Sequence, residues 1–377
     1  MIKARKAMKF LHTADLHLDS AFCASAGTDA FTRRQNQRQT LERIFALAKS
    51  EGCDMVLIAG DLFDSGFVFP ETKELCIKLF RDFGAPVVIA PGNHDPLSAS
   101  SFYQTADLPE NVRVFSSQAL EQIDFPSLKT TVAGYAFTSA ALPVSPLAAS
   151  GPAPHEEIYV LCAHADLDAP TSRYAPVTSS EIKRYGFDYA ALGHVHNIPS
   201  TPEHIRYCGF PEGRSFDELG DGYVLTVEIT PHSSPVVTSH KVSCERYLWQ
   251  EISLDGISSD IEARNIIENA VAAVSDEPTH LRLDLVGTLS GDVLPDFAAI
   301  EAACANKVRS IELRDNTLTL PEKGYLEKDT TLRGEFYRSL LPELMGDDPN
   351  VRGRALRALK IGLSAIDGKD FTNGGIK

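Results

Sequence analysis

Apolar and polar residues follow two alternating patterns along most of the chain, and these predict strands and helices in turn. Short apolar runs, typical of buried strands, alternate with segments whose apolar residues recur every three or four positions, as in amphipathic helices. The helical spacing occurs at residues 33–49 and 71–83. The predicted strands are residues 9–12, 55–59, 87–90, 112–115, 130–135, 158–162, 189–192 and 223–229. Because alternation comes early and strands dominate later, we expect an α/β layered sandwich and not a purely doubly wound sheet.

The pattern changes after about residue 242. A strand, a helix, a strand, a helix and a strand are predicted between residues 247 and 313, which is the order of a small α/β domain. Two amphipathic helices are predicted beyond it, at residues 331–345 and 349–366. We therefore expect a core domain at residues 1–242, a small α/β domain at residues 243–322 and a helical pair at residues 323–377.

The two C-terminal helices allow three interpretations. They pack on their own domain, or they dock a partner protein through their apolar face. The last helix also has four basic residues and no acidic residue between positions 350 and 366, which leaves DNA contact as the third interpretation.

Composition places the chain among soluble globular proteins. It has 377 residues, of which 43% are hydrophobic and 23% charged. No apolar run approaches the roughly 20 residues that span a membrane, and the N-terminus lacks the apolar stretch of a signal peptide. The seven cysteines are odd in number and form no Cys-x-x-Cys pair, so we expect buried free thiols. These features predict a cytoplasmic protein with no membrane partner.

The formal net charge of −15 limits how the chain could bind nucleic acid. A nucleic-acid-binding domain usually has a basic face. Here basic residues exceed acidic ones near the N-terminus, at residues 1–50, whereas residues 245–324 are acidic. Any contact with DNA must therefore be local, or be assisted by metal ions or a partner.

Five short polar motifs follow apolar, strand-like runs and supply the side chains that bind divalent metal ions. Their residues are Asp15, His17, Asp61, Asp64, Asn93, His94, His164, His194 and His196. Ligands at strand ends converge on one edge of a sheet, which is where open α/β folds place their chemistry. We therefore predict a two-metal site.

The bridging ligand of such a site would be Asp61, because one carboxylate has two oxygens and can serve two ions. Two ions about 4 Å apart clamp the attacking and leaving oxygens of a phosphodiester. A water bridging them loses a proton near neutral pH and becomes the nucleophile. Mixed His, Asp and Asn ligation favours Mn(II), with Fe(II) or Zn(II) as alternatives.

Three of the motifs resemble those of the calcineurin-like metallophosphoesterase superfamily. They are the stretch from His12 to Ser20, the sequence Ala-Gly-Asp-Leu-Phe-Asp at residues 59–64, and Pro-Gly-Asn-His-Asp at residues 91–95. They are most similar to the DNA-repair exonuclease branch, which holds the SbcD-type nucleases and their YhaO-like relatives. The resemblance covers residues 8–240 and implies a four-layer α/β/β/α sandwich, followed by a small capping domain and a helical tail.

The resemblance also implies which residues hold each metal ion. One ion would be bound by Asp15, His17, Asp61 and His196. The other would be bound by Asp61, Asn93, His164 and His194.

Two further residues resemble the catalytic pair of the family. His94 corresponds to the histidine that protonates the leaving oxygen or steadies the phosphate, and we expect it to act as general acid. Asp64 is placed like the carboxylate that orients this histidine. Some nucleases of the branch have a second histidine at that position.

Arg214 lies in a turn after the last metal motif and is a candidate for holding a substrate phosphate. A surface salt bridge to Asp217 or Glu218 is the alternative. Asp19 and Asp95 either support the metal ligands from outside or cap their own loops.

The resemblance implies a metal-dependent DNA exonuclease of DNA repair, which would work with a coiled-coil ATPase of the SbcC or YhaN type docked on the C-terminal helices. Nucleases of this family usually form homodimers through helices of the core domain. One alternative is a phosphodiesterase for nucleotides or other small phosphoesters, which the acidic charge favours and the extra domains oppose. The other is a non-catalytic scaffold, which the complete set of ligands opposes.

Overall fold

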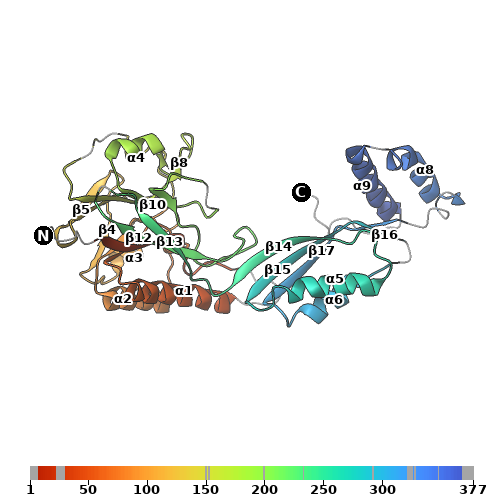
Figure 1. Cartoon of the computed structure of the whole chain (residues 1–377), viewed down its shortest axis with the longest axis horizontal. Coiled ribbons are helices and arrows are strands. Elements are labelled where there is room, and N and C mark those ends of the chain that lie inside the picture. Colours follow the sequence, from red (N-terminus) through yellow and green to blue (C-terminus); the bar gives the residue numbers. More distant parts are fainter. Residues whose placement is uncertain are drawn as a thin grey trace. The chain divides into compact units, whose positions relative to one another are not determined.

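Two compact units make up the computed structural model, Met1–Arg246 and Tyr247–Lys377 (Figure 1). The structure describes residues 7–22, 30–148, 151, 153–197, 200–231, 233–290, 293–320, 326, 328–346 and 348–366.

The larger of two sheets in the first unit has the strand order β13-β12-β1-β2-β3-β4. Strands β1 to β4 run parallel, whereas β12 is antiparallel to β1 and β13 to β12. The strands are β1 (Met8–Thr13), β2 (Met55–Ile58), β3 (Val87–Ile89), β4 (Val112–Val114), β12 (Tyr223–Ile229) and β13 (Val236–Lys241). Pairing of Phe10 with Met55 sets the register of the two strands that precede the first two motifs.

The second sheet of this unit has the order β11-β10-β7-β6-β5. Its strands are β5 (Glu121–Phe125), β6 (Thr130–Gly134), β7 (Ile158–His164), β10 (Tyr189–Gly193) and β11 (Ile205–Tyr207). Strands β6, β7, β10 and β11 run parallel, and β5 joins antiparallel at the edge. Short elements between the strands are α3 (Phe102–Thr105), η1 (Pro126–Leu128), β8 (Asp166–Leu167) and β9 (Pro176–Val177).

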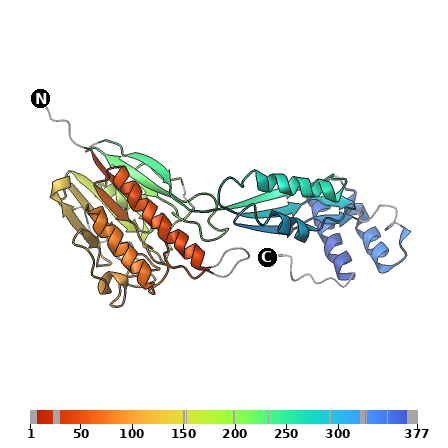
Figure 2. The same cartoon turned by 90° about the horizontal axis from the view of Figure 1, so that it is seen from below.

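Helices cover the outer faces of both sheets. Successive strand residues point to opposite faces, so Phe10 packs between the sheets while Leu11 packs toward the helices. Helices α1 (Ala30–Ser50) and α2 (Pro70–Phe83) lie side by side on the larger sheet, and α4 (Ser179–Tyr185) covers the smaller one (Figures 1 and 2). The predicted four-layer α/β/β/α sandwich is therefore confirmed.

The second unit contains the predicted order of strand, helix, strand, helix and strand. Its three-stranded sheet has the order β14-β15-β17, with an apolar core between sheet and helices. The elements are β14 (Arg246–Ser253), α5 (Asp260–Ala272), β15 (Thr279–Val286), β16 (Thr288–Ser290), α6 (Phe297–Cys304), β17 (Ser310–Asp315), β18 (Leu318–Leu320), α8 (Leu332–Leu344) and α9 (Pro349–Ile366). Helices α8 and α9 pack against each other.

Two sequence predictions concern the chain as a whole. The six described cysteines are free, and all but Cys244 are buried; Cys23 lies outside the described residues. None of the helices in the described ranges has the length and apolarity needed to cross a membrane. The predicted three-domain division stays a prediction, and its boundary at residues 322 and 323 lies outside the described residues.

Candidate metal centre

The nine motif residues lie at the carboxyl ends of five strands. Asp15 and His17 follow β1, Asp61 and Asp64 follow β2, and Asn93 and His94 follow β3. His164 is the last residue of β7, and His194 and His196 follow β10. The two sheets thus bring motifs that are far apart in sequence to one edge of the sandwich, as the strand pattern predicted.

Four of these residues have a left-handed backbone that is uncommon for non-glycine residues. The φ angles are 52° at Asp15, 45° at His17, 49° at Asp61 and 102° at His194. Each such residue costs on the order of 1–3 kcal/mol and persists only where its surroundings hold it. Here the loops hold one another: the Asp15 N–H donates to the Gly60 carbonyl at 3.1 Å, and the His17 N–H to that of Asp61 at 3.0 Å. These hydrogen bonds join the loops after β1 and β2 and so fix the directions of the side chains that they carry.

Glycines in three of the motifs allow the loops to approach one another. A Cβ atom on Gly60 would collide with the imidazole of His164, and one on Gly92 with the carboxylate of Asp61. A Cβ on Gly193 would collide with the Ala59 carbonyl oxygen. These positions need glycine because the neighbouring strand ends occupy the space that a side chain would fill.

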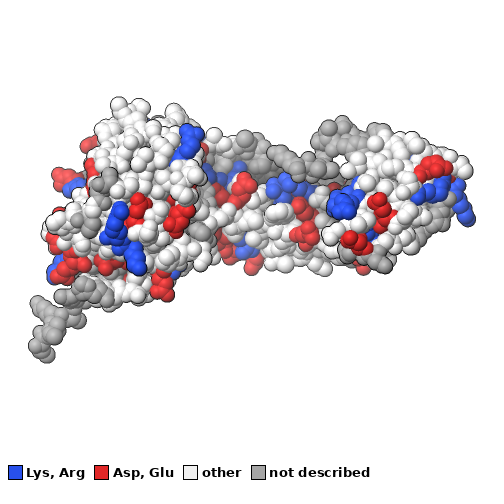
Figure 3. All heavy atoms as spheres, turned by 90° about the horizontal axis from the view of Figure 1, so that it is seen from above, with Lys and Arg blue, Asp and Glu red and all other residues white. Residues whose placement is uncertain are grey.

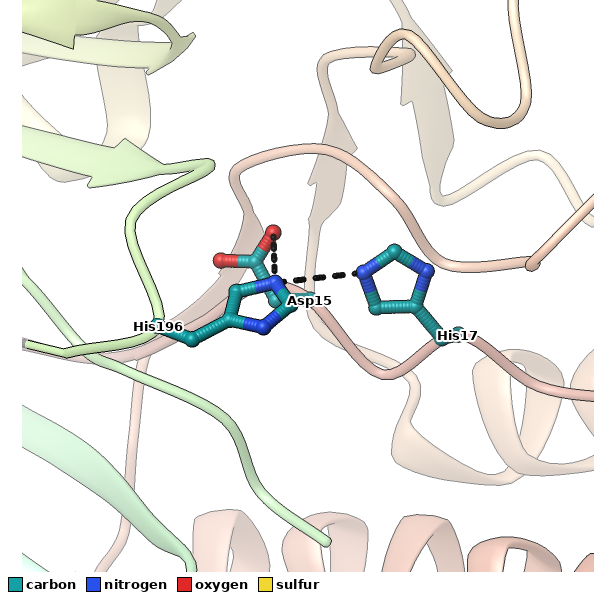
Figure 4. A group of neighbouring side chains, drawn as sticks. All are labelled: Asp15, His17 and His196. Atoms are coloured by element: carbon teal, nitrogen blue, oxygen red, sulfur yellow. Dashed lines mark hydrogen bonds and ion pairs between the residues drawn. The ribbon is translucent and has the colours of Figure 1, made fainter. Parts of the chain in front are cut away.

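Asp15, His17 and His196 form what we term the first cluster (Figure 4). The Nε2 atom of His196 lies 3.3 Å from Nε2 of His17 and 3.6 Å from Oδ1 of Asp15. Their candidate ligand atoms all lie within 4.8 Å of one another. One carboxylate and two imidazoles from both sheets therefore face a common point.

Asp61, Asn93, His164 and His194 form what we term the second cluster. Nε2 of His164 lies 2.9 Å from Oδ1 of Asn93, 3.3 Å from Oδ2 of Asp61 and 3.2 Å from Nδ1 of His194. The same Oδ2 atom of Asp61 lies 3.7 Å from Nε2 of His17. Asp61 thus lies between the two clusters, where the sequence predicts a shared ligand.

The charges around the clusters fit divalent cations. Burial lowers the pKa of His164, but the nearby Asp61 and Asp15 carboxylates outweigh it and raise this pKa to about 9. Burial likewise lowers the pKa of His196, whereas bonds to Asp15 and Glu218 raise it to about 9. The carboxylates therefore stabilise positive charge at this edge of the sandwich. Metal ions can supply that charge and let the imidazoles bind as neutral ligands.

His94 lies at the open rim of the clusters, with a side chain 45% exposed. Its backbone N–H donates to Oδ1 of Asp61 at 2.9 Å, and its ring lies 4.7 Å from that of His17. Its Nδ1 atom faces the backbone carbonyl oxygen of Asp64 at 3.2 Å, while the Asp64 carboxylate is 3.9 Å away. Asp64 thus contacts His94 mainly through its backbone, which differs from the expected carboxylate contact.

The carboxylate of Asp64 instead faces two other side chains. Its Oδ1 atom lies 3.1 Å from Nδ1 of His17 and 3.0 Å from Nη1 of Arg214. Arg214 also binds Glu218, with Nη2 at 2.7 Å from Oε1. The expected alternative of a salt bridge to Glu218 is therefore present, although both partners are largely buried and not at the surface.

Sequence reasoning missed two carboxylates that contact the predicted ligands. Oε1 of Glu218 lies 2.7 Å from Nδ1 of His196, and Oδ1 of Asp166 lies 3.4 Å from Nε2 of His194. Burial raises the pKa of Glu218, but bonds from His196 and Arg214 lower it to about 2, so this carboxylate is ionised. Neither residue belongs to a periodic pattern, and only the nearness of Asp166 to His164 in sequence could have drawn attention to it.

Asp19 and Asp95 both stabilise loops by accepting hydrogen bonds from backbone N–H groups. Asp95 accepts hydrogen bonds from the Gly92 N–H at 2.8 Å and the Phe63 N–H at 3.1 Å, and so joins the second and third motif loops. Asp19 accepts from the Phe69 N–H at 2.8 Å and from Arg38 at 3.1 Å. Their contacts fit the interpretation of loop capping.

Comparisons with known proteins agree with this geometry. The family model described as calcineurin-like phosphoesterase matches residues 8–197. Over 306 residues the chain is 29% identical to the protein named uncharacterized metallophosphoesterase YhaO from Bacillus subtilis (strain 168), covering 74% of this chain and 72% of that protein.

Two further relatives have names that mention DNA repair or a nuclease. The DNA double-strand break repair protein Mre11 of Methanopyrus kandleri is 25% identical over 240 residues, covering 57% of this chain and 51% of the relative. The SbcD component of nuclease SbcCD from Escherichia coli (strain K12) is 26% identical over 272 residues, covering 56% of this chain and 62% of the relative. The chain thus spans less than two thirds of the length of these two relatives.

Proposed function

The chain belongs to the calcineurin-like phosphoesterase family, and from that premise we propose that it is a metal-dependent nuclease that hydrolyses phosphodiester bonds of DNA. The observation that carries the proposal is the convergence of the two clusters and His94 on one edge of the sandwich. Asp15, His17, Asp61 and His196 would hold one ion, and Asp61, Asn93, His164 and His194 the other. Mn(II) fits this mixture of oxygen and imidazole ligands best, followed by Fe(II) or Zn(II).

Two divalent ions held there would supply positive charge to the phosphate and activate the attacking water. His94 would donate a proton to the leaving oxygen. Because a carbonyl oxygen can only accept, Nδ1 of His94 carries the hydrogen that it donates to Asp64. Nε2 is then the nitrogen that exchanges protons, and in the charged imidazole it can protonate the leaving oxygen. Asp64 would orient His94 through its backbone oxygen.

DNA as the substrate is supported by the names of the Mre11 and SbcCD relatives. The acidic net charge favours the alternative, a phosphodiesterase for small phosphoesters with the same metal chemistry. On the face drawn in Figure 3, acidic and basic side chains of the described residues are interspersed and form no continuous basic stripe. Metal ions would therefore have to provide much of the attraction for a DNA backbone.

We also propose that the helical pair α8 and α9 docks a coiled-coil ATPase of the SbcC or YhaN type. Support comes from large apolar side chains exposed on the pair: Leu332 is 68% exposed, Met345 64% and Ile361 44%. Amphipathic helices that dock a partner do so through exposed apolar side chains of this kind. A homodimer formed through helices of the first unit, and a place in the cytoplasm, are further parts of this proposal.

The test uses the full chain with Mn(II) and three substrates: a linear end-labelled duplex, a closed circular DNA and bis(p-nitrophenyl) phosphate. A His94→Ala variant is compared with His155→Ala, because His155 is exposed and precedes β7, at the opposite end of the strand that ends in His164. We expect the linear duplex to be degraded by the unmodified chain and by His155→Ala, and not by His94→Ala. Hydrolysis of the small diester with both DNAs intact would instead identify a small-phosphoester enzyme.

A further inference from the structure

We propose that Glu218 and Arg214 form a bracket outside the metal ligands that orients His196 and, through Asp64, His17. In this role both are positioning residues that set the metal affinity of the first cluster. The proposal rests on the proposed metal centre, since it concerns how two of its ligands are held.

The first half of the bracket is the contact between Glu218 and His196. Oε1 of Glu218 lies 2.7 Å from Nδ1 of His196, and only 5% of the Glu218 side chain is exposed. The opposite ring nitrogen, Nε2, faces Asp15 and His17. An ionised carboxylate can only accept, so it fixes the hydrogen on Nδ1 and leaves the Nε2 lone pair for a metal ion.

The second half of the bracket is a looser contact, because Asp64 lies close to His17 without a well-directed hydrogen bond to its buried Nδ1 atom. Oδ1 of Asp64 lies 3.1 Å from Nδ1 of His17, while Nε2 of His17 faces the cluster at 3.3 Å from Nε2 of His196. A carboxylate thus lies near the outer nitrogen of both imidazoles, hydrogen-bonded at His196 and within ion-pair distance at His17. Such partners fix ring orientation and raise the basicity of the ligand.

One arginine links the two carboxylates. Nε and Nη2 of Arg214 bind Oε1 of Glu218 at 3.1 and 2.7 Å, while Nη1 binds Oδ1 of Asp64 at 3.0 Å. The backbone N–H of Arg214 also donates to Glu218 at 2.7 Å. The planar guanidinium can hold both carboxylates at a set separation, which the single ammonium of lysine cannot do.

This use of Arg214 competes with the interpretation that it binds a substrate phosphate. All three guanidinium nitrogens already face carboxylates. An arginine that binds substrate would chiefly affect KM, and the effect would remain when metal is saturating. An arginine that positions ligands would change metal affinity even without substrate, and excess metal would restore activity.

The experiment titrates the full chain with Mn(II) and follows free Mn(II) by electron paramagnetic resonance. The variants are Glu218→Gln, which keeps the shape of the side chain, and Arg214→Lys, which keeps its charge. Asp217→Asn is the matched control, since Asp217 lies in the same loop but is exposed and bonds Ser215, which lies outside the bracket. Thermal melting in EDTA verifies that each variant is folded.

We expect two bound Mn(II) ions in the unmodified chain and in Asp217→Asn. In Glu218→Gln and Arg214→Lys, one of the two sites should bind about 10–100-fold more weakly, as found when outer partners of metal ligands are changed. With bis(p-nitrophenyl) phosphate as substrate, saturating Mn(II) should restore most of kcat without a raised KM.

Unchanged Mn(II) affinity in a folded Glu218→Gln chain would overturn the bracket. A raised KM at saturating Mn(II) in Arg214→Lys, with normal metal binding, would return Arg214 to the phosphate role. Absence of Mn(II) binding by the unmodified chain would overturn the proposed metal centre and the bracket with it, so the two failures are distinguishable.

Discussion

The two clusters of the candidate centre are held in different ways. In the first cluster, His17 and His196 have carboxylate side chains, Asp64 and Glu218, at their outer nitrogens. In the second, Nδ1 of His164 faces the backbone carbonyl oxygen of Ala59 at 3.1 Å, and this histidine is fully buried at the end of β7. The imidazoles of the first cluster therefore have side-chain partners from loops, whereas His164 of the second lies within a strand and has a backbone partner.

This difference determines which of the histidines a single substitution can reorient. The carbonyl oxygen of Ala59 cannot be removed by substitution, so the orientation of His164 depends on the backbone and on Gly60, which leaves room for its ring. The orientation of His196 depends on side chains that single substitutions can alter. We infer that single substitutions of partner residues change ligand orientation more readily in the first cluster than in the second. The following predictions test this comparison.

The largest effect is expected where the clusters meet, at Asp61. Replacing it with Asn removes the carboxylate that faces both His164 and His17. Both sites should lose affinity, and hydrolysis should fall on the order of 10³-fold, since metal ions supply several kcal/mol to such reactions. Mn(II) titration and initial rates with the small diester measure this. Loss of one ion alone would mean that Asp61 is not shared.

The second prediction tests the strand-built cluster through Gly60, which has φ of 93° and lies against His164. Gly60→Ala should lower the free energy of unfolding by about 2–5 kcal/mol, because backbone strain and a collision add. Gly52→Ala is the matched control, since its φ is 63° but a Cβ there meets open space. It should lose only about 1–2 kcal/mol.

Urea denaturation in EDTA measures both losses, and Mn(II) titration should detect weaker binding in Gly60→Ala alone. Equal losses in the two variants would show that His164 has room to move. The second cluster would then not be fixed by the strands, and the contrast with the first would disappear.

The third prediction concerns the loop that carries the bracket. Buried Glu212 accepts hydrogen bonds from the Cys244 N–H at 2.7 Å and the Glu245 N–H at 3.1 Å, and it also bonds Thr40. Burial raises the pKa of Glu212 to about 7. The folded pKa lies above the ordinary value of 4.5, so the protonated Glu212 carboxyl stabilises the fold relative to the ionised form. This contribution to the free energy of unfolding is fully present below pH 4.5 and is lost as pH rises through 7.

The loss should be on the order of 3 kcal/mol at most, at about 1.4 kcal/mol for each pH unit between the two pKa values. Glu212→Gln cannot ionise, so its free energy of unfolding should depend less on pH between 4.5 and 7. Denaturation curves across this range measure the slope. An unchanged slope would show that Glu212 does not titrate there and that the loop is fastened independently of pH.

The strands and the motif residues at their ends were predictable because an apolar run followed at once by polar residues marks a strand end. The edge strands β5 and β13 were missed, since both are largely exposed or half-buried and lack an apolar run. Glu218 was not predictable as a partner of His196, because side chains in loops follow no period. For Asp64, the sequence could not tell which of its oxygens would face His94.

The smallest effect is expected at Asp166, which faces His194 in the second cluster at 3.4 Å. This pair is partly exposed, with 23% of the Asp166 side chain and 19% of that of His194 accessible, so solvent weakens it. Asp166→Asn should therefore weaken Mn(II) binding by about 0.2–1 kcal/mol, or up to about fivefold. Glu218→Gln in the same titration provides the comparison. If Asp166→Asn proved as harmful as Glu218→Gln, the second cluster would depend on side chains as much as the first, and the strand ends alone would not explain how it is held.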